Sequence, residues 1–555
     1  MTESNAEKGE GPVTSAKAAL RERLPLILLA ILVVASAIFI LRLTSKIGFV
    51  TDEWNLLLLR PGWGLDQFME PFHEHTVIAP AFIYHVIQAV FGMDSALPYH
   101  LLSTGTFLLS CVLFFIYVRR RVGPWTALIM TALILFLGAA FEDLLWSFQI
   151  GYFGSLAAGI GALIALDRDD RKGDIWASAL LVVSLLFSSL GIPFVAGAVV
   201  EWLINPRDRR RRLYVPGAAV LFYAFWWLGW GHGADSELSL SNISNLPSYL
   251  FTSISAGFTS IAGLATGDGS EPEQPHLIWG RIFFLVALVA AAWRLKRRGS
   301  IPKGLWVVGA IGLSFYLLAG LNTSVLRPPE SSRYQLPSAI FILLVAAWVL
   351  EGVKVRIPVL TVAAVVSVFA IVNGLQLMDE EAKTRWQTTT ASLENSLGAI
   401  DIAGSSARPD YTLLVGLEDP VPIDDYLRAT NDSGSPGASE DELAASDPAT
   451  LVNTDSTLMN TLGLQLSASF PELSGKCTAI KAGEPLELTG RQFKVINRGK
   501  ELLGIGLSRF SPPPGLEIGS VLPEVSAGLA IPLDNSERPW TLTVIRGGPA
   551  RICAE

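Results

Sequence analysis

The sequence predicts a polytopic α-helical membrane protein of about eleven transmembrane helices, followed by a mainly β extracytoplasmic domain resembling a β-sandwich. Of the 555 residues, 50% are hydrophobic and only 17% are charged, against about 25% charged residues in soluble domains. The hydrophobic residues fill 24–377 in blocks. Residues 378–555 are polar and hold 14 Lys and Arg against 25 Asp and Glu, whereas the net charge of the whole chain is −8. The chain therefore divides into a membrane domain, 24–377, and an acidic soluble domain, 378–555.

Residues 1–23 precede the first apolar stretch. The first twenty of them are polar and low in complexity, which predicts a disordered, cytoplasmic N-terminus. The apolar stretch that follows is long and has no small-residue cleavage pattern after it, so we do not expect a cleaved signal peptide.

Eleven apolar stretches are candidates for membrane spans, since a helix needs about 20 residues to cross the bilayer core. One longer apolar run has basic loops at both ends and is therefore divided in two, with the reversal at 188–193. The spans are 24–43, 97–118, 124–141, 150–166, 174–189, 190–204, 213–230, 277–293, 303–321, 335–350 and 356–377.

Basic loops predict the orientation of these spans, because Lys and Arg are retained on the cytoplasmic side. The basic segments are 119–124, 171–174, 207–212, 294–303 and 351–356, and the loops between them are 141–149, 231–275 and 322–333. This pattern predicts a cytoplasmic N-terminus and an extracytoplasmic C-terminal domain, in what we take to be a bacterial plasma membrane.

Two further apolar segments, 76–92 and 246–265, do not fit as spans. A span at 76–92 would place the basic segment 119–124 outside. We expect both segments to form helices that lie in the outer membrane interface.

Titratable residues gather in the predicted outer loops. Carboxylates at a membrane face are costly unless they are solvated or paired, so this grouping favours a polar site there. The chain has no P-loop or dinucleotide fingerprint and no cytoplasmic domain, so any group transfer outside would use a lipid-linked donor. The residues are Asp52, Glu53, Glu70, His73, Glu74, His75, Glu142, Asp143, Arg327, Glu330, Arg333 and Tyr334.

The order of segments resembles the amino-terminal third of GT-C class glycosyltransferases. After the first span come an acidic pair, the helix "APAFIYHVIQAVFG" (79–92), a short "MDSALPYHLLS" (93–103) and a span ending in "YVRRRVG" (117–123). The segment "SSRYQLPSAIF" (331–341) is similar to the Arg-Tyr segment at the head of a late span in these enzymes. The class includes protein O-mannosyltransferases, aminoarabinose transferases of lipid A and actinobacterial arabinosyltransferases.

The resemblance implies transfer of a sugar from a polyprenyl-phosphate donor to a glycan, lipid or protein acceptor in the cell envelope. The catalytic acid of the class lies just after the first span, where this chain has Asp52 with Glu53 beside it. A carboxylate there acts as general base on the acceptor hydroxyl, with inversion at the anomeric carbon. Arg333, and after it Arg327, is the candidate cation for the leaving phosphate.

Cofactors and other partners follow from the same resemblance. Glu142 and Asp143 match acids that hold a divalent metal in oligosaccharyltransferases of the class, or they orient the acceptor here. A divalent cation is thus an open alternative, with no cofactor required. Membrane lipid is an expected partner and nucleic acid is not.

Each candidate residue also has a structural interpretation. Asp52 suits the N-cap of a following helix, and Glu142 and Asp143 suit a solvated loop. His73, Glu74 and His75 are too few for a zinc site and suit interfacial packing, while Arg333 could extend its side chain from a helix start to the interface.

Two other functions remain open. A lipid or glycan transporter would need ionisable residues in mid-membrane and internal repeats, and the predicted spans show neither. A non-catalytic protein that binds glycans through its C-terminal domain would not need Asp52 or Arg333.

The C-terminal domain has short alternating stretches separated by turn residues. Examples are "DYTLLVGLE", "LELTGRQFKVIN", "LLGIGLSRF" and "WTLTVIRG", a pattern typical of β-sandwiches. Residues 431–448 suit a mobile loop or linker. Cys477 and Cys553 would pair in an oxidising compartment. We expect this domain to bind sugar or cell wall, or else to cover the membrane site.

Overall fold

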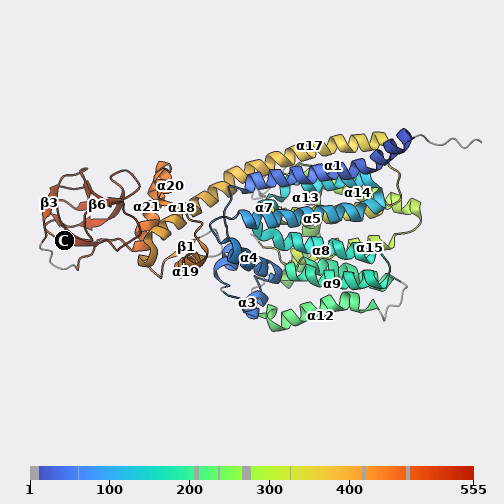
Figure 1. The fold of residues 1–555 in the computed structure, drawn as a ribbon, viewed down its shortest axis with the longest axis horizontal. Helices are drawn as coiled ribbons and strands as arrows, with labels where there is room; N and C mark the ends of the chain where they lie inside the picture. The colour runs from blue at the N-terminus through green and yellow to red at the C-terminus, as the bar shows by residue number, and fades with distance from the viewer. Residues whose placement is uncertain are drawn as a thin grey trace, which may run out of the picture. The chain divides into compact units, whose positions relative to one another are not determined.

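The computed structural model describes residues 12–60, 62–205, 212–234, 238–265, 277–324, 327–414, 420–469 and 475–554. The chain is mostly helical, and its first strand begins at Thr412 (Figure 1). It divides into two compact units. The helical unit comprises Met1–Lys46, Gly62–Ile83 and Tyr99–Arg385, and the mixed unit comprises Ile47–Pro61, Tyr84–Pro98 and Trp386–Glu555.

Seven helices within the described ranges are long and apolar enough to cross a membrane. An eighth is added if α6 (Pro124–Leu135) and the bent segment Gly138–Leu145 count as one span. The seven candidate spans are Arg23–Thr44 within α1 (Pro12–Thr44), Leu97–Val122 (α5), Ser147–Leu166, which ends with α8 (Ile150–Leu166), Leu277–Arg298 (α14), Lys303–Leu321 (α15), Ser332–Val349, which ends with α16 (Gln335–Val349), and Ile357–Ser406, which begins with α17 (Ile357–Glu381).

Shorter helices account for the other apolar stretches. The three predicted spans between 174 and 230 form α9 (Arg171–Phe187), α10 (Gly191–Ile204) and α12 (Tyr214–Gly229). The chain leaves helical geometry at Ser188, where the backbone is extended, so the predicted reversal at 188–193 is confirmed as a helix break. The two predicted interfacial segments form α4 (Ile78–Phe91) and α13 (Leu246–Ile261).

The predicted N-terminal boundary needs a correction. Helix α1 begins at Pro12, so the backbone of residues 12–23 is helical where the composition predicts disorder. The prediction for residues 1–11 lies outside the described ranges. Residues 13–24 contain no Gly or Pro, and the helix continues through Pro25 into the apolar part, which extends it beyond its apolar residues.

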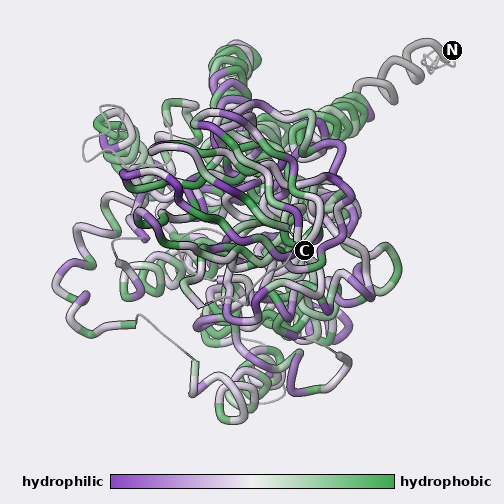
Figure 2. The backbone as a smooth tube through the Cα atoms, turned by 90° about the vertical axis from the view of Figure 1, so that its left-hand side faces the viewer, coloured by the Kyte–Doolittle hydropathy of each residue, from purple (hydrophilic) through white to green (hydrophobic). Residues whose placement is uncertain are grey.

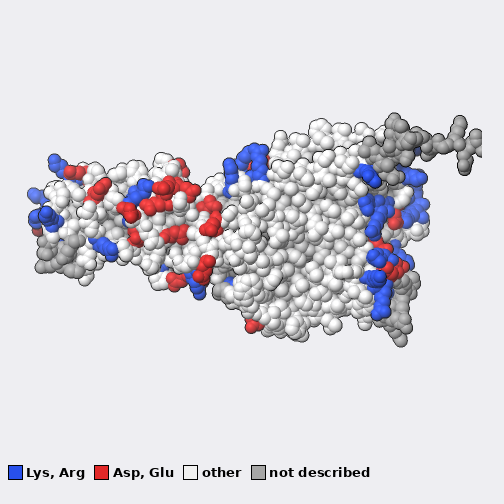
Figure 3. Space-filling model, in the orientation of Figure 1, with Lys and Arg blue, Asp and Glu red and all other residues white. Residues whose placement is uncertain are grey.

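Ion pairs join the loops that the sequence predicts to be cytoplasmic. Arg121 Nη2 lies 2.7 Å from Asp167 Oδ1, between the ends of α5 and α8. Arg212 pairs with Asp174 at 3.0 Å, and Arg298 pairs with Glu351 at 2.8 Å. Figure 3 shows Lys and Arg gathered at one end of the helical unit. The basic loops therefore share one end of the helices, as the orientation rule requires.

Hydrogen bonds join the segments at the end that the sequence predicts to be outer. Trp226 Nε1 donates to the Met69 carbonyl at 2.8 Å, which ties the end of α12 to the short helix α3 (Leu65–Met69). Asn242 Nδ2 donates to the Leu321 carbonyl at 3.0 Å, which ties the start of the 231–275 loop to the end of α15. Residues 235–237 and 266–275 of this loop lie outside the described ranges.

The mixed unit contains two four-stranded antiparallel sheets. Their strand orders are β3-β10-β5-β8 and β4-β9-β6-β7, and hydrophilic and hydrophobic stretches are mixed in the part of the chain around the C-terminus (Figure 2). Buried residues of both sheets, such as Phe493, Leu507 and Trp540, belong to one hydrophobic core. The strands are β3 Cys477–Ile480, β4 Pro485–Glu487, β5 Gln492–Asn497, β6 Leu503–Ser508, β7 Leu516–Val521, β8 Ser526–Ala530, β9 Thr541–Arg546 and β10 Ala550–Ala554.

The prediction of a mainly β domain over 378–555 is wrong for its first part. Residues 387–462 are largely helical, with only the short pair β1 (Thr412–Leu414) and β2 (Pro420–Pro422) among the described residues there. The helices are α18 Gln387–Ala403, α19 Ile423–Ser433, α20 Glu440–Ala444 and α21 Pro448–Leu462. These helices are short and rich in Ser, Thr, Asn and Asp, which makes them hard to tell from loops by apolar pattern alone.

The predicted linker 431–448 is also corrected. Ser439 and Glu442 form a reciprocal capping box at the start of α20, and Asp447 caps α21 through the amides of Ala449 and Thr450. The Ser435 amide donates to Asp94 Oδ1 at 3.0 Å. Side-chain caps of this kind satisfy helix-end donors, so the segment is built into the mixed unit.

Asp455 of α21 fixes the segment that follows β6. The side chain is fully buried. Its Oδ2 accepts from the amides of Arg509 (3.1 Å) and Ser511 (2.9 Å) and from the Ser511 hydroxyl (2.6 Å). Its Oδ1 accepts from the Phe510 amide at 3.0 Å. One carboxylate thus satisfies four donors.

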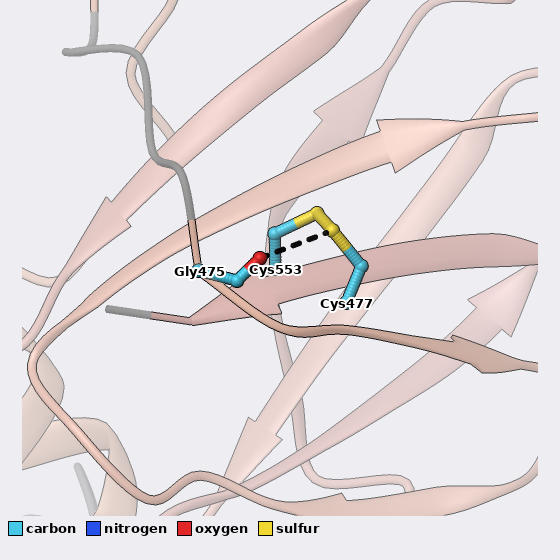
Figure 4. Close-up of a disulfide and its surroundings, with 3 residues drawn as sticks. All are labelled: Gly475, Cys477 and Cys553. Atoms are coloured by element: carbon cyan, nitrogen blue, oxygen red, sulfur yellow. Dashed lines mark hydrogen bonds between the residues drawn. A yellow bond between two sulfur atoms is a disulfide. The ribbon is translucent and has the colours of Figure 1, made fainter.

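The predicted cysteine pair is confirmed. Cys477 and Cys553 form a disulfide between directly opposed positions of β3 and β10 (Figure 4). The crosslink closes 76 residues of chain and so encloses almost the whole two-sheet part of the mixed unit. Cys111 is buried and not crosslinked.

Candidate functional site

The first loop that the sequence predicts to be outer turns back on itself at Phe72–His75. The Phe72 amide donates to the His75 carbonyl at 3.1 Å, and the His75 amide donates to the Phe72 carbonyl at 2.9 Å. His73 has a φ of +47°, a left-handed conformation that residues other than glycine adopt rarely. Strained residues of this kind are concentrated at functional sites.

Glu74 connects this turn to the last outer loop. Its Oε1 lies 2.6 Å from Arg327 Nη1, and the two side chains are only 13% and 14% exposed. The same oxygen accepts a hydrogen bond from the side-chain amide of Asn322. His75 Nε2 lies 3.5 Å away. Glu74 and Arg327, 253 positions apart in the chain, thus meet in one polar group.

The charges in this group follow from burial and pairing. Burial alone would raise the pKa of Glu74, but the attraction of His75 and Arg327 outweighs it and lowers the pKa below its ordinary value. Burial lowers the pKa of His75, and the Arg327 charge lowers it further against the pull of Glu74. Because His75 is then neutral at neutral pH, Arg327 is the lasting counter-charge of Glu74.

A second carboxylate–arginine pair lies between α7 (Phe141–Leu145) and the start of α16. Glu142 Oε2 accepts from the Arg333 amide at 2.9 Å and lies 3.7 Å from Arg333 Nε. The Glu142 amide donates to Ser332 Oγ at 3.1 Å, and that hydroxyl donates to the Ala139 carbonyl at 2.7 Å. The Arg333 side chain is 36% exposed, so this pair is looser and more open than the Glu74–Arg327 pair.

Asp143 is the least compensated acid of the group. It is fully buried, and neither of its oxygens makes a hydrogen bond of ordinary geometry with the described residues. Glu142 repels its charge, and Arg333 attracts it. Apart from a backbone contact with Leu336, its carboxyl group has no hydrogen-bond donor among the described residues, which makes its burial costly. Because the side chain is fully buried, the interpretation of Asp143 as a solvated loop residue is wrong.

The two pairs form a single electrostatic group. Tyr334 lies within reach of the charges of Arg327, Arg333, Glu74 and Glu142, and its ring contacts Phe315 with centroids 6.2 Å apart. We call Glu74, Glu142, Asp143, Arg327, Arg333 and Tyr334 the arginine–carboxylate cluster. Six of the twelve residues named for the predicted polar site are therefore brought together, with His73 and His75 beside them.

Asp52 and Glu53 belong to the mixed unit, whereas the arginine–carboxylate cluster belongs to the helical unit. The prediction that Asp52 meets Arg333 therefore stays a prediction. Asp52 is partly exposed and occupies the N-cap position of α2 (Glu53–Leu58), but its side chain makes no capping hydrogen bond.

Glu53 has a structural position. It is fully buried, its Oε2 accepts from the Val50 amide at 2.9 Å, and its Oε1 accepts from the Tyr84 hydroxyl at 2.7 Å. The neighbouring Trp54 packs edge-on against Tyr426, with ring centroids 6.2 Å apart. Glu53 thus holds the parts of the mixed unit together, which leaves Asp52 as the better candidate base.

Sequence reasoning missed the neutral polar residues of the cluster. Asn322, Ser331 and Ser332 hydrogen-bond to Glu74 or Glu142. All three lie in the polar run between two apolar helices, "LNTSVLRPPESSRY" (321–334). Amides and hydroxyls that interrupt apolar helices at a polar loop were the available signal.

Within the described ranges, no group of three or more His, Cys, Asp or Glu side chains is arranged to hold a metal ion. No protein-family model, curated protein or solved structure matches this chain.

Proposed function

We propose that the protein is a GT-C-like glycosyltransferase that moves a sugar from a polyprenyl-phosphate donor to an envelope acceptor outside the membrane. The observation that carries this proposal is Asp143, fully buried beside the charges of Glu142 and Arg333, with only a backbone contact to Leu336 at its carboxyl group. A hydroxylated and phosphorylated substrate offers what this arrangement lacks, because sugar hydroxyls donate to carboxylates and phosphate accepts from guanidinium groups.

In the proposed reaction, the Asp52 carboxylate removes the proton of an acceptor hydroxyl as its oxygen attacks the anomeric carbon. The bond between that carbon and the phosphate oxygen breaks on the opposite face, and polyprenyl phosphate leaves with the electron pair. The configuration at carbon is inverted. Proton transfer of this kind contributes about 10²–10⁴-fold to a rate.

Arg333 is the preferred partner of the leaving phosphate. Its distance of 3.7 Å from Glu142 and its exposure of 36% make it easier to redirect to a ligand than Arg327, which is held at 2.6 Å by Glu74. Glu142 then orients Arg333, and Asp143 accepts a hydrogen bond from a sugar hydroxyl.

The remaining parts of the proposal concern the membrane and the mixed unit. We propose eleven spans with the N-terminus in the cytoplasm and residues 386–555 outside, supported by the ion pairs that join the basic loops to one another. Two sheets with one core favour a β-sandwich, and binding of envelope glycans by it stays a prediction.

The proposed function is tested with purified full-length protein in lipid nanodiscs and radiolabelled polyprenyl-phosphate hexoses and pentoses. Asp52→Asn should lower transfer about 10²–10⁴-fold at unchanged melting temperature. The matched control is Asp432→Asn, at an exposed acid of α19, which should transfer at the wild-type rate. Full activity of Asp52→Asn would remove the base assignment, and no transfer by the wild type from any of these donors would remove the function.

A further inference from the structure

A polar cavity borders the Phe72–His75 turn. It has a volume of about 610 Å³ and is lined by Asp66, Glu70, Pro71, His73, Trp230 and Gly233, among others. We call it the Asp66–Trp230 pocket. Its size falls in the range of roughly 300–1,000 Å³ that is usual for small-molecule sites. Every lining residue belongs to the helical unit.

Two tryptophans from one helix end fix the geometry of this pocket. Trp226, fully buried, donates to the Met69 carbonyl at 2.8 Å. Trp230 donates its indole N–H to Asp66 Oδ1 at 3.1 Å. Helix α3 is thereby held against the end of α12, and the indole and carboxylate that line the cavity are ordered without a ligand. Such preorganisation lowers the entropic cost of binding.

The chemistry of the lining selects the class of ligand. Asp66 and Glu70 supply carboxylate acceptors, Trp230 supplies an apolar aromatic ring, and His73 supplies a further polar ring. No Lys or Arg is among the lining residues that the structure describes. A phosphate or uronate would therefore be repelled, whereas a polyol donates hydrogen bonds to carboxylates and lays its C–H face on an indole.

The turn relates this pocket to the arginine–carboxylate cluster. His73 lines the pocket, and the next residue, Glu74, pairs with Arg327. The left-handed backbone at His73 and the reciprocal hydrogen bonds of Phe72 and His75 keep these two consecutive side chains in different sites. A ligand in the pocket is therefore separated from the cluster by one tight turn.

We propose that the Asp66–Trp230 pocket binds a neutral or amino-bearing saccharide. Its role as the acceptor site rests on the proposed function, whereas binding itself does not. A saccharide held here is fixed by carboxylates and indole, and its uncharged end extends past the turn toward the cluster. The acceptor of the proposed enzyme would then be uncharged or cationic, whereas its donor is an anionic lipid.

The test uses full-length protein in detergent micelles on a printed array of neutral, amino-bearing and uronate- or phosphate-bearing oligosaccharides. We expect binding to neutral or amino-bearing glycans and none to the anionic ones. Trp230→Ala should weaken the binding about tenfold or more. The sugar loses its contact with the indole ring, and Asp66 loses the hydrogen bond from the indole N–H that orients its carboxylate. The matched control is Trp63→Ala, at an exposed outer-loop tryptophan that contacts Phe68 and Phe82 and should bind as wild type.

A second variant guards against misfolding. Asp66→Asn keeps an acceptor oxygen for the Trp230 N–H, so its melting temperature should stay near wild type while glycan affinity falls about tenfold. Binding of anionic glycans, binding of none, or unchanged affinity in both pocket variants would each overturn the proposal. Asp52→Asn should bind glycans normally, because Asp52 is not among the residues that line the pocket. If the wild type binds glycans but transfers no sugar, the proposed function is overturned and the proposed pocket is not.

Discussion

Replacing Asp455 by Ala should destabilise the mixed unit more than any other single carboxylate truncation that we consider. The side chain is fully buried, and its two oxygens accept four hydrogen bonds from residues 509–511. Truncation removes both acceptor oxygens, and with them four hydrogen bonds, and leaves three backbone amides without their partner.

The magnitude follows from these bonds. A buried donor left without a partner costs about 1–3 kcal/mol, so three amides give roughly 3–9 kcal/mol. The bonds share one carboxylate and are not additive, and water can enter the space left by the side chain. We therefore expect a loss of about 4–6 kcal/mol, a large part of the stability of a domain.

Hydrogen exchange on full-length protein in nanodiscs measures this loss locally. The amides of β6, which precede residues 509–511, exchange through opening of the mixed unit. A loss of 4 kcal/mol or more should speed their exchange by about 10³-fold. Asp447→Ala is the matched control, because this exposed cap of the same helix bonds the amides of Ala449 and Thr450.

Loss of the Asp447 cap should cost only about 1 kcal/mol and speed exchange less than about tenfold. If Asp455→Ala accelerates exchange in β6 no more than Asp447→Ala does, burial and the number of hydrogen bonds do not determine how much a carboxylate contributes to the free energy of unfolding of this unit.

Four further outcomes are expected. Replacing both Cys477 and Cys553 by Ser should lower the free energy of unfolding of the mixed unit by about 4.5 kcal/mol, the loop-entropy value for a 76-residue separation. In the wild-type protein, after mild reduction of intact cells, an impermeant maleimide should label these two cysteines; labelling only after permeabilisation would reverse the orientation. Burial, together with the charge of Glu442, raises the pKa of Glu394 to about 7; this residue lies beyond the apolar part of its helix. The stability that its neutral form contributes is therefore fully present below pH 4.5 and is lost as the pH rises through 7. Glu394→Gln should flatten the profile of melting temperature against pH between pH 5 and 8, and an unchanged profile would contradict the assignment. Arg333→Gln should raise the KM for the lipid donor about 10- to 150-fold, and an unchanged KM with a lowered kcat would exclude a ground-state contact with phosphate.

The sequence was informative wherever apolar length carries the signal. All eleven apolar stretches form helices, and so do both segments assigned to the membrane interface. The break at 188–193 was found from the charges of the flanking loops. Hydropathy is reliable here because a chain in lipid must satisfy its backbone hydrogen bonds within each segment.

The helices of 387–462 were missed although local signals existed. "SEDE" at 439–442 is a capping-box pattern, and Asp447 before Pro448 is an N-cap followed by proline at the first helical position. Composition pointed the other way, because Gly, Ser, Pro and Asp are also the residues of linkers. The caps were the stronger physical argument.

The sequence indicated the charged residues of the arginine–carboxylate cluster but not which residues pair with one another. Opposite charges in predicted outer loops had to be paired or solvated, which indicated Glu74, Glu142, Arg327 and Arg333. Which acid takes which arginine depends on helix positions that hydropathy does not determine. The structural role of Glu53 depends on Tyr84, 31 residues away, and no local pattern reports it.

The order of the segments in the mixed unit bears on how the protein is made. Residues 47–61 and 84–98 leave the ribosome before most of the helical unit, yet Trp54 and Met93 have their partners at Tyr426 and Ser433. This unit cannot complete its fold during synthesis and must wait for the last third of the chain. A translated but unfinished chain carries Trp54 and its neighbouring leucines without their final packing, which makes that stage the one where a chaperone would act.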